Sequence, residues 1–159
     1  MCRFRETTFE LLGGVTELNF NKLNWGDDGA VQLAVVLPLC AKLTEFKLLD
    51  TQLGDKGAAA LAGAIKGNGV VKRLFLGNNH IGDAGAAAFA DALRVNGVLG
   101  WLALGNNKIG DAGAAALADA LRVNGALTEL LLYGNQIGED AKSKLREAVQ
   151  GRSGFELEL

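Results

Sequence analysis

Aspartates at regular spacing are the first residues of this chain that could do chemistry. Four of them follow a glycine and recur at equal intervals along the chain: Asp27, Asp55, Asp83 and Asp111. A catalytic pair of carboxylates needs two of them close together, with environments that separate their pKa values. Equal spacing distributes the carboxylates along the chain instead. We therefore expect each aspartate to cap the N-terminus of the helix that it begins.

The glycines around these aspartates could be taken for a phosphate-binding loop. GDKGAAALAG at 54–63 and GDAGAAA at 82–88 each open a predicted helix, and a helix N-terminus attracts anions. A phosphate loop, however, continues with Lys and then Ser or Thr, which neither run does. The aspartate also occupies the anion's place, so turns and caps are expected here, and no cofactor.

Histidine and cysteine offer little more. His80 is the single histidine, which leaves neither a His-based triad nor a two-His metal site. Cys2 and Cys40 lack the spacing of a metal site, and we expect free thiols in a reducing compartment, the cytoplasm. The sequence therefore predicts a protein that is not an enzyme, without catalytic residues, cofactor or metal.

The composition is that of a globular protein. Of the 159 residues 49% are hydrophobic, and 22 are glycine against one proline, which is typical of many tight turns. The net charge is −2 and no run of Lys and Arg occurs, which argues against binding to nucleic acid or a membrane surface. No apolar stretch could span a bilayer, and residues 1–14 carry charges where a signal peptide needs an apolar core.

The elements that position these residues follow from an internal repeat. The stretch GNNHIGDAGAAAFADALRVNG at 77–97 recurs at 105–125 with only two changes, at 80/108 and 89/117. A fixed period of this size indicates a solenoid, in which neighbouring units complete each other's core. The same 28-residue step divides the chain into five units: 15–42, 43–70, 71–98, 99–126 and 127–154.

Each unit changes its hydrophobic period halfway. Alternation around Leu74 and Leu76 predicts a short strand, and apolar residues at 86, 89, 90 and 93 predict a helix that Gly97 ends. Between them, we expect the buried Asn79 to bond backbone groups of the turn. Parallel strands stack more closely than helices do, so the stack should curve with the strands on the concave side and the helices on the convex side.

The full pattern resembles a known family. L-x-x-L-x-L-x-x-N-x-I-G-D-x-G-A-x-A-L-A-x-A-L is similar to the ribonuclease-inhibitor-like class of leucine-rich repeats, over about residues 15–154. The class also occurs in nucleotide-binding immune receptors and in Ran GTPase-activating protein. The resemblance implies an α/β horseshoe arc, a leucine-rich repeat solenoid. Leu23 and Thr51 replace the Asn of the pattern, which predicts a weaker hydrogen-bond ladder in the first two units.

The ends of the array depart from the pattern. Residues 1–14 are an N-terminal flank or a partial repeat, in which 4–12 could form a short capping helix or the chain could continue a longer array. The helix at 139–149 carries charges where earlier helices carry alanine, as a cap should. The strict Glu–Leu alternation at 155–159 predicts a terminal strand. The whole of 1–159 is then a single leucine-rich repeat domain.

The outward strand positions supply the candidate binding site. They gather apolar side chains on the third to fifth units, with charges mostly on the first three, and the small Gly77 and Gly105 beside them predict a low floor. Exposed aromatic residues with a charged rim are typical of a protein-binding surface. The predicted partner-binding residues are Trp101, Phe75, Leu131, Tyr133, Arg73, Glu129 and Leu49.

This pattern predicts a non-catalytic protein–protein interaction module that binds a protein or peptide partner through its concave face. Two alternatives stay open. One is a GTPase-activating protein of the Ran type, which the resemblance permits although no residue here could be matched to that activity. The other is a structural subunit or fragment of a larger repeat receptor.

Overall fold

A parallel sheet forms one layer of the molecule. The computed structural model describes residues 14–159. In this part of the chain six strands lie in sequence order, each beside the next. They are β1 (Glu17–Asn19), β2 (Glu45–Lys47), β3 (Arg73–Phe75), β4 (Trp101–Ala103), β5 (Glu129–Leu131) and β6 (Glu156–Glu158). Neighbouring strands pair at equivalent positions of successive units, as Arg73 pairs with Trp101 and Trp101 with Glu129. The last pair of strands is separated by one residue less along the chain, so that Glu129 pairs with Glu156.

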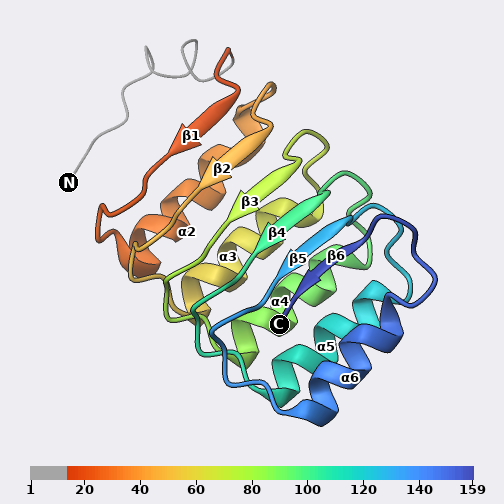
Figure 1. The fold of residues 1–159 in the computed structure, drawn as a ribbon. Helices are drawn as coiled ribbons and strands as arrows, with labels where there is room; N and C mark the ends of the chain where they lie inside the picture. Colours follow the sequence, from red (N-terminus) through yellow and green to blue (C-terminus); the bar gives the residue numbers. More distant parts are fainter. Residues whose placement is uncertain (1–13) are drawn as a thin grey trace.

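Helices form the second layer. They are α2 (Gly26–Val36), the 3-10 helix η1 (Leu37–Leu39), α3 (Asp55–Lys66), α4 (Asp83–Leu93), α5 (Asp111–Leu121) and α6 (Glu139–Ala148). All lie on the same side of the sheet, whose other face is open (Figure 1). Each crossover packs its helix against the helix of the unit before it. The predicted α/β solenoid, with strands on one side and helices on the other, is confirmed.

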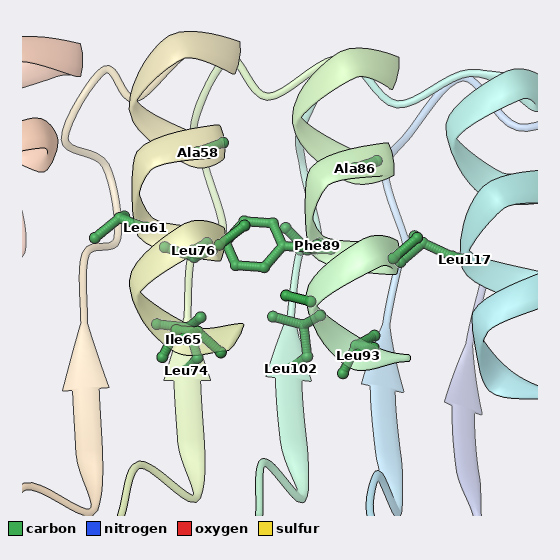
Figure 2. Packing of buried hydrophobic residues seen from close by; sticks show 14 of the residues in the cluster. Ala58, Leu61, Ile65, Leu74, Leu76, Ala86, Phe89, Leu93, Leu102 and Leu117 are labelled. Atoms are coloured by element: carbon green, nitrogen blue, oxygen red, sulfur yellow. The ribbon is translucent and has the colours of Figure 1, made fainter. Parts of the chain in front are cut away.

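The core lies between the two layers. Leu74 and Leu76 point into it from β3 and the turn that follows, and neither side chain is exposed. Phe89 lies between α3 and α4, and Leu117 lies in the same place between α4 and α5 (Figure 2). The two near-identical stretches therefore differ, at Phe89 and Leu117, only in which apolar side chain occupies the equivalent space in the core.

The predicted asparagine ladder forms in the turns after the strands. The Asn79 carboxamide oxygen accepts hydrogen bonds from the backbone N–H groups of Thr51 and Leu53, each at 3.0 Å, and its NH2 group donates to the Leu48 carbonyl at 2.7 Å. Thr51, which stands where the pattern has Asn, donates its hydroxyl to Leu48 and to the Asn79 oxygen. Both bonds lie within its own unit and the next, so among residues 14–159 the Thr51 side chain makes no ladder bond to the first unit, in agreement with the weaker ladder predicted there.

The aspartates cap helices, but not the helices that they begin. The backbone of Gly82 occupies the cap position of α4, and Asp83 makes no bond to its own helix there. The Asp83 carboxylate instead accepts the N–H groups of Gly110, at 2.7 Å, and Gly113, at 2.9 Å, at the start of α5. The expectation of caps within one helix was wrong, because the amides within reach belong to the next unit. The same bonds join α2 to α3 and α3 to α4.

Glycine makes this contact between units possible. A Cβ atom on Gly85 would lie 2.7 Å from the Ile81 side chain, 2.8 Å from the Asp55 carboxylate and 2.9 Å from Ala58. Any larger residue would push the carboxylate away from the amide that it caps. Glycine at this position is thus required by the packing between the helices and by the cap together.

Replacing Asp83 with alanine should lower the free energy of unfolding by about 1–2 kcal/mol, because the N–H groups of the α5 cap residue Gly110 and of Gly113 in its first turn would lose their acceptor. Urea denaturation followed by circular dichroism measures this. Asp119→Ala is the matched control: its carboxylate bonds only the exposed Arg122, so its loss should stay within about 0.5 kcal/mol. Equal effects of the two substitutions would contradict the role assigned to Asp83.

A second asparagine ladder follows the helices, and the sequence interpretation missed it. Helix α4 ends at Leu93, so Gly97 does not stop it as predicted. Asn96 lies between them, and its buried side chain donates to the carbonyl groups of Ile65 and Asn68 while accepting the N–H groups that lead into β4. Asn124 repeats these bonds one unit later. The recurrence of Asn in the two near-identical stretches was the available signal.

The C-terminal end replaces this asparagine with a longer side chain. Arg152 stands one repeat step after Asn124, and its guanidinium donates to the carbonyl groups of Leu121 and Leu127. The predicted terminal strand forms as β6 and pairs with β5. The predictions for the other end, a flank over 1–14 with a short helix at 4–12 and a free Cys2, concern residues before Gly14 and lie outside the described part.

Candidate interaction surface

The open face of the sheet carries the seven predicted partner-binding residues. In β4 the inward Leu102 is fully buried, whereas its neighbour Trp101 is only partly covered. Phe75, Leu131, Arg73 and Glu129 occupy the equivalent outward positions of β3 and β5. Leu49 and Tyr133 lie just beyond the ends of β2 and β5. The alternation of inward and outward residues along each short strand places them all on the same side.

Two aromatic side chains lie in contact at the centre of this surface. The rings of Phe75 and Trp101 are 5.3 Å apart between centroids, at 49°. The Arg73 guanidinium lies 4.7 Å from the centre of the Trp101 ring, and the Lys47 ammonium lies 5.6 Å from that of Phe75. The Trp101 indole N–H is covered and has no acceptor among residues 14–159. Contacts of this kind fix the orientation of the rings while leaving part of each exposed.

Glutamate, lysine and arginine side chains on the β1–β3 side of the surface form ion pairs with one another. The Lys47 ammonium lies 2.7 Å from the Glu17 carboxylate and 2.6 Å from that of Glu45, and the Arg73 guanidinium lies 3.6 Å from Glu45. Hydrogen bonds to Glu17 and Glu45 raise the pKa of Lys47, and the hydrogen bond from Lys47 lowers the pKa of Glu45. This side is therefore a closed network of opposite charges.

The low floor expected at the glycines is filled. A Cβ atom on Gly77 would lie 3.3 Å from the Leu49 side chain, and one on Gly105 would lie 2.6 Å from the Tyr133 ring. Both glycines are buried. The Leu49 side chain covers Gly77 and the Tyr133 ring covers Gly105, so the surface is flatter than the sequence indicates. Tyr133 keeps 43% of its area exposed.

The β5–β6 side of the surface is acidic. Glu129 is half-buried, and burial is the main cause that raises its pKa; the neighbouring Glu156 and Glu158 carboxylates raise it further, while Arg73 acts in the opposite direction. The sequence interpretation assigned the two glutamates of β6 to a terminal strand and did not include them in the binding surface. The pairing of β6 with β5 brings them beside Glu129.

The cysteine, histidine and aspartate residues considered above as catalytic candidates have structural roles or lie apart from one another. Cys40 is a buried free thiol whose pKa is raised by burial, and His80 is exposed. The carboxylates of Asp27, Asp55 and Asp83 cap helices. In residues 14–159 no group of three or more His, Cys, Asp or Glu side chains could hold a metal ion. No helix of this part has the length and apolar character needed to cross a membrane.

Comparisons with known proteins agree with this architecture. A family model described as "Leucine Rich repeat" matches residues 39–62, 67–90 and 102–118. No curated protein matches the chain. Among solved structures, actin-binding site 2 of leiomodin-1 superposes with a TM-score of 0.78 at 24% identity, over 94% of this chain and 89% of that one. The C-terminal domain of Caenorhabditis elegans tropomodulin gives 0.73 at 17% identity, over 91% and 90%.

Proposed function

We propose that this chain, a leucine-rich repeat protein, is a non-catalytic interaction module that binds a protein or peptide through the open, concave face of its sheet. The observation that carries the proposal is the contact between Phe75 and Trp101, two aromatic residues held in place but partly exposed. Rigid aromatic side chains that are already ordered lose little entropy on binding, which is why they dominate many protein interfaces.

The covered N–H group of Trp101 supports the same proposal. A buried donor without an acceptor costs about 1–3 kcal/mol in a folded protein. Nothing in the fold requires a tryptophan at this position, because Arg73 and Glu129 occupy it in the neighbouring strands. A partner that presents a carbonyl or carboxylate to this N–H group would satisfy the donor.

Actin is the first protein to test as partner. The leiomodin-1 structure whose fold resembles this chain is an actin-binding site, which makes actin the natural first candidate. We further propose an intracellular location, which the free thiol of Cys40 supports. Stimulated GTP hydrolysis by a candidate GTPase would instead favour the Ran-type alternative, and an upstream array of repeats would favour a fragment of a larger receptor.

Replacing Trp101 with alanine should weaken binding by about 2 kcal/mol or more, because the substitution removes the centre of the proposed contact. Binding is measured by fluorescence anisotropy, with actin monomers and with peptides selected on the chain from a displayed random library. The fold should persist with a smaller loss, under about 1.5 kcal/mol, since the Phe75 ring loses one neighbour.

Val95→Ala is the control for this measurement. Val95 follows α4 and is 61% exposed, so it is a large apolar side chain away from the open face. Its replacement should change neither binding nor stability. If partners are found and Trp101→Ala binds them as well as the unaltered chain does, the contact between Phe75 and Trp101 is not the binding site.

A further inference from the structure

The open face divides its charges unevenly. On the β1–β3 side Lys47 and Arg73 each lie beside a carboxylate. On the β5–β6 side Glu129 pairs in register with Glu156, and Glu158 pairs with Leu131. Adjacent strands are about 4.8 Å apart, so the three carboxylates are neighbours. Among residues 14–159 none of them forms an ion pair with Lys or Arg, and Arg73, the cation that lowers the pKa of Glu129, is paired with Glu45.

A structural role does not account for this arrangement. Like charges directly opposite one another on adjacent strands destabilise a sheet. Charges on the terminal β6 can be understood as protection of an open edge against pairing with other chains. Glu129, however, lies on the interior strand β5 and is half-buried. Burial and the neighbouring Glu156 and Glu158 carboxylates raise its pKa.

Apolar surface adjoins the carboxylates. Leu131 lies in the same strand as Glu129, Trp101 lies opposite Glu129 in β4, and Tyr133 exposes its ring just after β5. A ligand for this place combines an apolar stem with a positive end, which describes the side chains of lysine and arginine. Phosphate groups would be repelled by the same carboxylates, which argues against nucleic acid and anionic lipid as occupants.

We propose that the partner of the open face, whose existence rests on the function proposed above, is a basic peptide segment of a protein. It places a lysine or arginine between Glu129, Glu156 and Glu158 and an adjacent apolar residue on Trp101 and Tyr133. The charge complementarity fixes the direction in which the segment crosses the sheet, because the opposite side of the surface already has its charges paired. The acidic side therefore determines which partner binds, and the aromatic centre supplies contact area.

The experiment uses peptides selected on the unaltered chain from a displayed random library, and measures their affinity for variants. Selected peptides should contain lysine or arginine, and Glu129→Gln should weaken their binding about tenfold or more. The double variant with Glu156→Gln and Glu158→Gln should do the same, and added salt should weaken binding to the unaltered chain. Glu147→Gln, an exposed glutamate on α6 away from the sheet, should have no effect.

The pH dependence adds a second readout. A peptide bound by Glu129 should be released as the pH falls through the raised pKa of that carboxyl group, before ordinary glutamates take up protons. The charges around this group on the packed elements are Arg73 on β3 and Glu156 and Glu158 on β6. Because the folded-state pKa is raised, ionised Glu129 costs stability as the pH rises through it. Glu129→Gln should therefore keep or increase the melting temperature at neutral pH while weakening binding.

Failure of this inference is distinguishable from failure of the proposed function. Peptides that need Trp101 but lack basic residues, or bind Glu129→Gln unchanged, would overturn the basic partner and leave the open face as the binding site. Peptides that need Glu129 but not Trp101 would overturn the combined contact and indicate attraction by charge alone. If no selected peptide responds either to Trp101→Ala or to Glu129→Gln, the open face is not the binding site and the proposed function itself is wrong.

Discussion

Replacing Phe89 with alanine should lower the free energy of unfolding by about 3–5 kcal/mol. The Phe89 ring is fully buried and fills the space between α3 and α4 above the sheet (Figure 2). Helices pack farther apart than the strands beneath them, so this space cannot close when the ring is removed. The substitution therefore adds the energy of a cavity to the loss of apolar contact. Urea denaturation followed by circular dichroism measures the effect.

Two variants make the result specific. Phe89→Leu introduces the residue that the next unit has at the same place, Leu117, and should cost distinctly less than alanine because most of the space stays filled. Val95→Ala, in an exposed position, should stay within about 0.5 kcal/mol of the unaltered chain. If Phe89→Ala is as mild as Val95→Ala, the ring does not support the packing of α3 against α4.

Replacing Asn107 with alanine should cost about 2–3 kcal/mol. The Asn107 side chain accepts the Ile81 N–H at 3.0 Å and donates to the carbonyl groups of Leu76 and Leu104, each at 3.0 Å, and of Gly105 at 3.3 Å. These backbone groups are buried, so water cannot replace the lost partner, and each unpaired group costs about 1–3 kcal/mol before the turn relaxes. The same urea titration measures the loss.

Lys108→Ala is the matched control for Asn107→Ala. Lys108 follows Asn107 directly and is exposed, and it stands where the preceding unit has His80. Its side chain should contribute less than about 0.5 kcal/mol. Similar losses for the two substitutions would mean that the turn does not depend on the buried amide. A loss at Asn107 alone would show that the ladder between units, and not the turn sequence in general, stabilises this edge of the sheet.

The sequence by itself determined the repeating architecture. A constant repeat step, with alternation around Leu74 and helical spacing up to Leu93, is sufficient to predict the strands, the helices and their parallel register. The same alternation predicts that Trp101 and Phe75 face outward and that Leu102 is buried. These predictions succeed because periodicity is a local property that each unit repeats, and stacking identical units leaves little choice of register.

Only the tertiary structure decided which groups meet between units. From the repeated pattern alone, the Asp83 carboxylate could cap either its own helix or the helix of the next unit. Only the distances in the folded structure show that it accepts the N–H group of Gly110. For the same reason the ring of Tyr133 over Gly105 was missed, since the sequence records the small residue but not the larger one that leans over it. Glu129 acquires its acidic surroundings from the strand that follows it, where the repeat step becomes shorter than in the rest of the array. Local patterns encode which face a side chain takes, whereas contacts between neighbouring units depend on how their backbones stack.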